Sequence, residues 1–174
     1  MAANKLICAL FGILVISAWV LGSAIQAGAE TLNFKVYTWA VKQENIPVGD
    51  AEGHNVGSYV RPAFIVFENG EVATSYAVGT FDWLKPSISI QQYKTWTFSD
   101  GSTMFIKTTH GIVGGTTEAA TSGGWKSEII KGTGRFEGIK GTERISIKYL
   151  PQEKWEVGQK GYGEGTITYT LPSK

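Results

Sequence analysis

Hydrophobic and polar residues alternate along most of the chain after residue 30. Leu32, Phe34 and Val36 are separated by the polar Asn33 and Lys35, and this two-residue period is typical of a strand with one buried face. Similar alternation recurs at residues 87–98, 102–109, 144–149 and 166–171. No segment shows the period of an amphipathic helix of ten or more residues. The pattern predicts an all-β protein of about eight strands.

Two pairs of predicted strands are joined by short turn sequences. Residues 64–67 and 72–81 flank an Asn69-Gly70 pair, which suits a type I′ turn because both residues tolerate a positive φ. Residues 87–98 and 102–109 are separated by Ser99-Asp100-Gly101. We therefore predict two hairpins.

About eight antiparallel strands in one domain favour a closed barrel or a sandwich. A closed barrel leaves no exposed strand edge, and glycines can serve at its corners and bulges. Proline has no N–H for a strand ladder, so Pro62, Pro86 and Pro151 are expected at strand ends or edges. No repeat or linker divides the chain, which predicts a single domain.

The first 29 residues have a different character. Lys5 precedes an apolar run from Leu6 to Leu21, and Ala27-Gly28-Ala29 supplies the small residues that a signal peptidase needs. The alternative is a membrane anchor, but the run is short for a bilayer and no basic stop-transfer cluster follows it. We predict a signal peptide over residues 1–29, cleavage after Ala29, and a barrel domain over residues 30–174. The protein is then periplasmic or secreted, without stable membrane association after cleavage.

Charge and cysteine content exclude several classes of function. The chain of 174 residues has 16 Lys and Arg against 15 Asp and Glu, and without residues 1–29 the two signs are equal. Recognition of nucleic acid needs a surplus of basic side chains, so no nucleic-acid partner is expected. The one cysteine, Cys8, lies in the predicted signal peptide, which leaves no thiol for a disulfide or a thiolate metal site. No cofactor is predicted.

A glycine-rich segment interrupts the strand pattern at residues 129–147. Its glycines, Gly132, Gly134, Gly138 and Gly141, surround Phe136. A phosphate-binding loop would need a helix directly after the glycines, whereas a strand pattern begins at residue 142. We predict a tight excursion of the backbone in which glycines permit positive φ or close approach and Phe136 plugs one barrel end.

The run from Gly132 to Gly141 resembles the Gly-Ser/Thr-Gly-x-Phe-x-Gly-x-x-Gly segment of the allene oxide cyclase barrel family. Plant dirigent proteins carry a related Gly-Thr-Gly-x-Phe segment. The resemblance is specific over about twenty residues, and it implies an eight-stranded, calycin-like antiparallel barrel with an elongated apolar cavity. Because the cyclases are trimers, it also implies a homo-oligomer.

The catalytic part of this resemblance does not carry over. The first strand of the cyclases reads Val-Tyr-Glu-x-Asn, where the Glu promotes epoxide opening and the Asn helps to hold a water. The matching positions here run from Val36 to Ala40, with Thr38 at the Glu position and Ala40 at the Asn position. Neither side chain can perform the corresponding task. Dirigent proteins orient phenoxy radicals with acidic residues in the cavity, and no equivalents can be placed from the sequence.

Glu52, His54 and His110 are the candidate catalytic residues. An imidazole can transfer protons near neutral pH, and Asp50 or Glu52 could orient His54. The alternative is a solvated loop. His110 follows a strand and either faces the cavity mouth or ends the strand. Because a zinc site needs three or four converging ligands and neither histidine has a ligand-spaced partner, no metal site is predicted.

Aromatic residues interleaved with Thr and Gly fit a cavity that takes an apolar ligand, although Trp and Tyr also fill barrel cores. The ligand-binding candidates are Tyr37, Trp39, Tyr76 and Phe136. The leading hypothesis is an exported barrel that binds a small hydrophobic or aromatic molecule. The first alternative is an isomerase or cyclase that acts on a small lipid-like substrate in the same cavity. The second is a structural protein with a packed interior.

Overall fold

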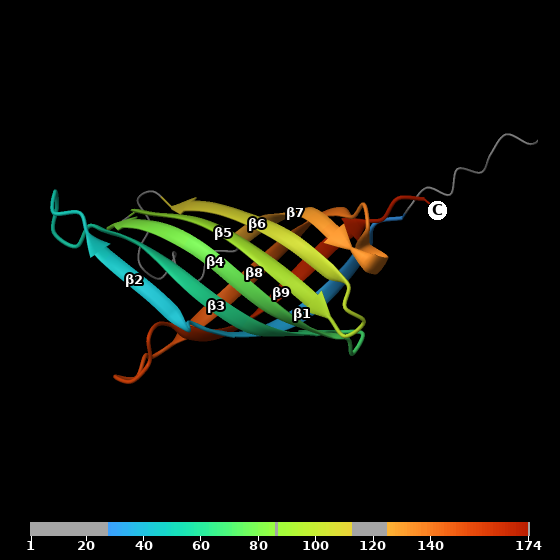
Figure 1. The fold of residues 1–174 in the computed structure, drawn as a ribbon, viewed down its shortest axis with the longest axis horizontal. Helices are drawn as coiled ribbons and strands as arrows, with labels where there is room; N and C mark the ends of the chain where they lie inside the picture. The colour runs from blue at the N-terminus through green and yellow to red at the C-terminus, as the bar shows by residue number, and fades with distance from the viewer. Residues whose placement is uncertain (1–27, 86, 113–124, 174) are drawn as a thin grey trace, which may run out of the picture.

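The computed structural model describes residues 28–85, 87–112 and 125–173, so nearly all of the predicted signal peptide lies outside the described residues. Nine strands and one short 3₁₀ turn make up the fold (Figure 1). They are β1 (Glu30–Trp39), β2 (Lys42–Pro47), β3 (Asn55–Phe67), β4 (Val72–Leu84), β5 (Ser87–Phe98), β6 (Thr103–Ile112), β7 (Trp125–Thr133), η1 (Gly134–Phe136), β8 (Lys140–Leu150) and β9 (Lys160–Thr170).

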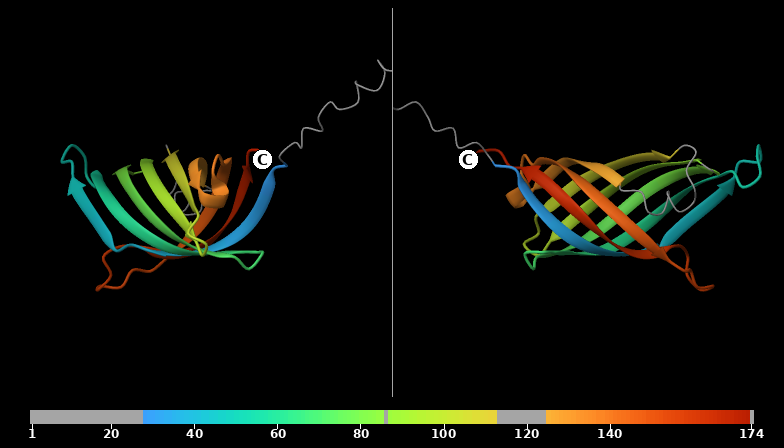
Figure 2. Two further views of the ribbon diagram at one scale, coloured as in Figure 1. Left: turned by 45° about the vertical axis from the view of Figure 1, so that its right-hand side comes forward. Right: turned by 180° about the vertical axis from the view of Figure 1, so that it is seen from behind.

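Eight of the strands close into an antiparallel barrel. The sheet order is β1-β9-β8-β7-β6-β5-β4-β3-β2, and an additional pairing of β1 with β3 closes the ring. Figure 2 shows the barrel from behind, where β1, β9 and β8 lie side by side. β2 pairs with the first half of β3 beyond the closed ring. The all-β class and the closed barrel of about eight antiparallel strands are confirmed.

The chain bends between β1 and β2, opposite Pro62. The pairing of β1 with β3 ends at Thr38 and Ala63, and the pairing of β2 with β3 begins at Lys42 and Val60. Pro62 therefore lies inside a strand, and the prediction that it lies at a strand end or edge is wrong. The missing N–H of Pro62 falls at the point where β3 stops pairing with β2 and begins to pair with β1. A strand tolerates proline at such a point. The Thr38 hydroxyl donates to the Pro62 carbonyl at 3.0 Å.

The two predicted hairpins are present and share one turn geometry. Gly70 N donates to Phe67 O at 3.0 Å, and Gly101 N donates to Phe98 O at the same distance. Gly70 and Gly101 have φ values of 84° and 80°, whereas no other residue type has a positive φ in the described part of the chain. Asn69 therefore does not adopt a type I′ conformation. Each connection is a type I turn followed by a left-handed glycine, the usual three-residue hairpin loop.

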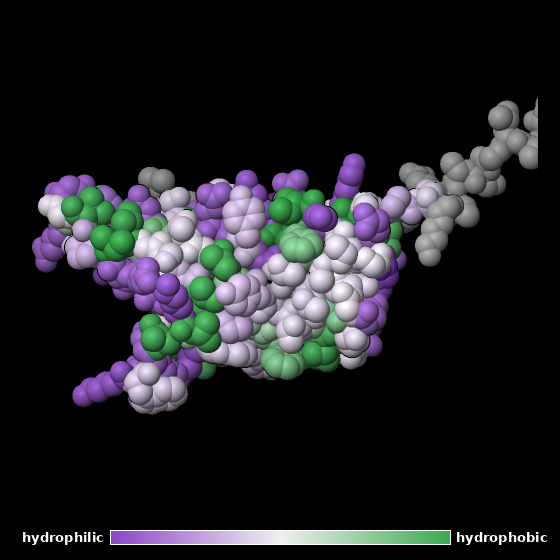
Figure 3. All heavy atoms as spheres, viewed as in Figure 1, coloured by the Kyte–Doolittle hydropathy of each residue, from purple (hydrophilic) through white to green (hydrophobic). Residues whose placement is uncertain are grey.

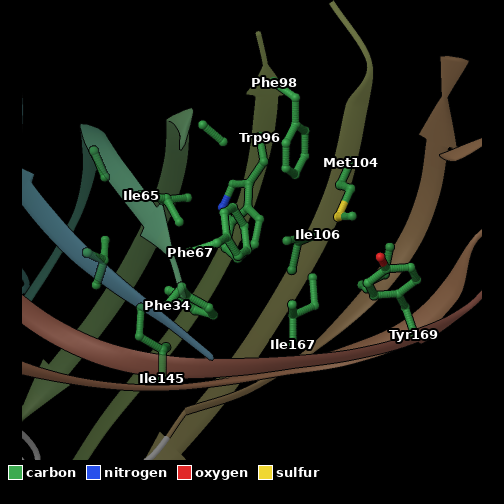
Figure 4. Close-up of a cluster of buried hydrophobic side chains, with 14 of the residues drawn as sticks. Phe34, Ile65, Phe67, Trp96, Phe98, Met104, Ile106, Ile145, Ile167 and Tyr169 are labelled. Atoms are coloured by element: carbon green, nitrogen blue, oxygen red, sulfur yellow. The ribbon is translucent and has the colours of Figure 1, made fainter. Parts of the chain in front are cut away.

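Aromatic side chains fill one half of the barrel. Phe34 meets Trp96 edge-on with ring centroids 5.1 Å apart, and Phe67 stacks on Phe98 at 5.7 Å. Figure 4 shows these rings pointing inward from separate strands, together with apolar side chains of β6 and β9. Aromatic contacts of this kind stabilise a core beyond their buried area. This half of the barrel is a packed core.

The glycine-rich segment closes that end of the barrel, as predicted. Phe136 of η1 is buried and lies 4.8 Å from the Phe98 ring, centroid to centroid. Gly134 and Gly138 have positive φ values of 62° and 75°. Gly141 is needed for a different reason, because a Cβ there would lie 2.3 Å from the Thr168 carbonyl oxygen. In Figure 1, η1 lies near the C-terminus, and the connection between β2 and β3 lies at the opposite end.

Candidate functional site

A small cavity lies in the barrel interior, next to the aromatic core. It has a volume of about 50 Å³, and Trp96 forms part of its wall. Apolar and small side chains line most of it, and five larger polar or charged side chains come from three strands. The apolar and small wall residues include Val36, Thr38, Ala63, Ile65, Ser75, Ala77, Trp96, Ile145 and Ile147, and the larger polar ones are Arg61, Gln92, Lys94, Glu143 and Tyr149.

Lys94 and Glu143 form an ion pair across this interior. Lys94 Nζ lies 2.7 Å from Oε1 and 2.5 Å from Oε2 of Glu143. The two side chains are 7% and 0% exposed. β5 and β8 are not neighbours in the sheet, so the pair connects separate walls of the barrel. Because a buried charge is costly without a partner, each of these residues depends on the other.

Arg61 is held by aromatic rings. Its guanidinium carbon lies 4.9 Å from the centroid of the Tyr59 ring and 5.3 Å from that of Tyr149, and Nη1 donates to the Tyr149 hydroxyl at 2.9 Å. The Tyr59 hydroxyl donates to Gln92 Oε1 at 2.8 Å. Burial raises the pKa of Tyr59 well above its ordinary value. Arg61 and the residues around it therefore present a fixed cation and hydrogen-bonding side chains to the cavity.

These interior charged residues are not among the candidates predicted from the sequence, although the signal for them is present. Lys94 has the same phase in β5 as the buried Ile90 and Trp96, and Glu143 has the same phase in β8 as Ile145. A charge at a position in phase with a buried face must find a partner inside. The alternation therefore identifies Lys94 and Glu143 as interior groups, whereas their contact depends on barrel closure.

Three of the four aromatic ligand-binding candidates do not line the interior. Tyr37, Trp39 and Tyr76 are 52%, 42% and 55% exposed, and they lie on the outer face of the barrel. Each is out of phase with the buried residues of its strand, and none belongs to the wall of the interior cavity. Figure 3 shows apolar and weakly polar side chains over much of the outer face formed by β3, β4 and β5. The fourth candidate, Phe136, packs in the closed end and is not part of the cavity wall.

His54 lies between two aspartates near the end opposite η1. Nδ1 lies 2.5 Å from Asp50 Oδ1, and Nε2 lies 3.0 Å from Asp82 Oδ1. These contacts raise the pKa of His54, mainly through Asp50 and then through Asp82, and the contact with His54 lowers the pKa of Asp50. The predicted orientation of His54 by Asp50 is therefore observed. Glu52 is exposed in the same connection.

His110 lies in β6 opposite Ile90 of β5. None of the three catalytic candidates, Glu52, His54 and His110, belongs to the wall of the interior cavity. Within residues 28–85, 87–112 and 125–173, no three His, Cys, Asp or Glu side chains are grouped as metal ligands would be. The same part of the chain contains no helix that is long and apolar enough to cross a membrane.

A second hollow of about 720 Å³ lies along β1, β3, β8 and β9. Charged side chains, Lys35, Glu68, Arg144 and Glu164, contribute to its rim. Glu68 is occupied by hydrogen bonds from the backbone N and Nδ2 of Asn33, which lower its pKa. Ligand sites are usually enclosed, and this hollow is more open to solvent than the interior cavity. The interior cavity is the better candidate site.

The sequence matches no protein-family model and no curated protein. Among solved structures, the fold is similar to that of two pterocarpan synthase dirigent proteins, PsPTS1 and GePTS1. Each has a TM-score of 0.50 and 16% identity to this chain. The match with PsPTS1 covers 84% of this chain and 97% of PsPTS1, and the match with GePTS1 covers 83% of this chain and 92% of GePTS1. The chain has a dirigent-like barrel fold. A nonspecific heme-binding cyclase of neoabyssomicin biosynthesis also matches, with a TM-score of 0.48 and 15% identity, over 99% of this chain and 81% of the cyclase.

At these identities, the likeness to the two dirigent proteins extends to the fold alone. It supports the dirigent half of the resemblance drawn from the glycine-rich segment, and it does not single out the allene oxide cyclases. The dirigent-like barrel is compatible with a small molecule bound in the interior.

Proposed function

We propose that the protein binds a small hydrophobic or aromatic molecule in the barrel interior. The observation that carries this proposal is the cavity beside Trp96, where apolar walls meet a few fixed polar groups. Small-molecule sites commonly combine these two features, because apolar walls supply affinity and the polar groups fix orientation. The packed aromatic core at the η1 end gives the site a rigid floor.

The size of the cavity limits the ligand. An engineered cavity of about 150 Å³ admits benzene, and this cavity has about a third of that volume. A whole ring therefore does not fit inside this cavity. The ligand inserts a narrow group into the cavity and keeps the rest of its atoms outside it.

Ligand-detected NMR with small aromatic fragments tests this proposal. Ala77 is buried on the inner face of β4 and belongs to the cavity wall, so Ala77→Phe should fill the cavity and abolish saturation transfer to bound fragments. Val78 is the next residue and lies on the outer face, which makes Val78→Phe the matched control. Binding that survives Ala77→Phe would contradict an interior site.

The alternative function is an isomerase or cyclase in the same cavity. The observation that favours it is the Lys94–Glu143 pair, which places an acid and an ammonium group in the cavity wall. These residues replace Glu52, His54 and His110 as the candidates for proton transfer. An enzyme of this kind would lose turnover on Glu143→Gln while it retained ligand binding. A binding protein would show no turnover with any ligand that it retains.

We also propose that the protein is exported and forms a homo-oligomer. Tyr162, Tyr37 and Phe64 are exposed and lie in register across β9, β1 and β3, where they form an uncharged outer strip. Two copies can meet through such a strip without repulsion between like charges. N-terminal sequencing of the protein from its host should begin at Glu30, and light scattering should show an oligomer that Tyr37→Ser weakens. A mature chain that retains residues 1–29 would contradict export. A monomer at all concentrations would contradict the homo-oligomer.

A further inference from the structure

Arg61 is a half-buried cation without a carboxylate partner in the described residues. It is absent from every ion pair that the structure shows, and its neighbours Tyr59 and Tyr149 supply aromatic faces and a hydroxyl oxygen instead. Both carboxylate oxygens of Glu143 are occupied by Lys94. The cavity wall therefore carries one positive charge more than its carboxylate can balance.

The unused donors of Arg61 are the two that suit a carboxylate. Nη1 is engaged by Tyr149, whereas Nε is buried and makes no hydrogen bond within the described part of the chain. Nε and Nη2 form the side edge of the guanidinium, which pairs with the two oxygens of a carboxylate. Nε is shielded in this conformation, so both oxygens of a carboxylate can pair with this edge only when the guanidinium turns to expose it.

The volume sets the size of the bound group. A water needs roughly 10–15 Å³ of such space, so about 50 Å³ holds roughly three to five atoms of that size. Formate and acetate have three and four heavy atoms. Water alone would satisfy hydrogen bonds of Arg61 but would leave its half-buried charge without a counter-ion, which a carboxylate supplies.

We propose that the cavity binds a carboxylate group of formate or acetate size through the Nε and Nη2 edge of Arg61. This inference rests on the proposed function, in which the interior takes a ligand, and it assigns that ligand an acidic end. The carboxylate is either a free short acid or the end of a longer one. Arg61 supplies the charge and the paired donors, and the apolar wall formed by Ile65 and Trp96 contacts the remaining atoms.

Calorimetric titration with acetate and with acetamide, at matched ionic strength, tests the proposal on the unaltered chain. The two molecules have similar size and shape, and only acetate is charged. We expect saturable binding of acetate and at least tenfold weaker binding of acetamide, because a hydrogen bond to a charged group contributes about a factor of ten or more. Butyrate and hexanoate extend the test. If affinity falls from acetate to hexanoate, the natural ligand is a free short acid. If affinity stays the same or rises, the natural ligand is a longer acid whose carboxylate end occupies the cavity.

Variants add a second test. Arg61→Lys keeps the charge and removes the paired donors, so acetate should bind about tenfold more weakly, and Arg61→Gln should abolish the difference between acetate and acetamide. Arg144→Gln, on the outer face of β8, is the control and should leave binding unchanged. Equal binding of acetate and acetamide by the unaltered chain would overturn the proposal whether or not the variants fold. If aromatic fragments still bind in that case, the proposed function survives, and if nothing binds, both fail.

Discussion

Lys94 and Glu143 pair across the inside of the barrel, with the ammonium nitrogen within 2.7 Å of both carboxylate oxygens. Removal of one partner leaves a buried charge without compensation. We therefore expect Lys94→Met or Glu143→Leu alone to lower the free energy of unfolding by about 3–5 kcal/mol. Urea denaturation of each variant, followed by tryptophan fluorescence, measures this loss.

The double variant Lys94→Met/Glu143→Leu is the informative control for that experiment. Because it buries no charge, its stability should return to within about 1 kcal/mol of the original protein or exceed it. A double variant whose loss equals the sum of the two single losses would show that the residues contribute independently, contrary to the observed contact.

Phe136 should contribute to stability as a core residue, although it lies in a three-residue turn. It is buried against Phe98, so Phe136→Ala should cost about 3–5 kcal/mol. Phe136→Leu keeps an apolar side chain at the same place and should cost much less, about 1.5 kcal/mol or below. Equal losses for the two variants, measured by thermal and urea unfolding, would argue against a packed plug.

The His54 cluster should make stability depend on pH in a defined window. Asp50 and then Asp82 raise the folded-state pKa of His54 above 6.5, so its contribution is complete below pH 6.5 and is lost as the pH rises through the raised value. Asp50 has a lowered pKa because of its hydrogen bond with His54, and its contribution is present above pH 3.8 and is lost as the pH falls through the lowered value.

NMR titration of the His54 ring measures the first of these shifts directly. The pKa should fall toward 6.5 in Asp50→Asn and, to a smaller extent, in Asp82→Asn. Glu52→Gln is the control from the same connection and should leave the titration unchanged, since Glu52 is exposed there and is not among the causes of the His54 shift. A His54 pKa at or below 6.5 in the unaltered protein would contradict the observed geometry.

The strands and hairpins could be predicted because their determinants are local. Alternation placed Phe34 and Val36 on a buried face, and Gly70 and Gly101 marked two of the turns. The plug at Phe136 could also be predicted from its surrounding glycines. The turn type at Asn69 could not be predicted from the sequence. A type I turn followed by a left-handed glycine requires only the glycine, so the Asn69-Gly70 pair fits it as well as it fits a type I′ turn.

The site was harder to predict because it depends on contacts between distant strands. The phase that places Phe34 inside already places Tyr37 and Trp39 outside, so a stricter use of alternation would have excluded these two from the cavity. Lys94 and Glu143 could have been identified as interior charges in the same way. Their pairing could not, since it joins β5 and β8 across the closed barrel.

Native mass spectrometry of the protein, purified under gentle conditions from its natural host, tests the central claim most directly. A barrel that binds a small molecule through its interior should carry a discrete mass excess. Ala77→Phe, which fills the cavity, should remove that excess, and Val78→Phe on the outer face should retain it. A protein that always has the mass of its chain alone, or a ligand that stays bound to Ala77→Phe, would contradict the account.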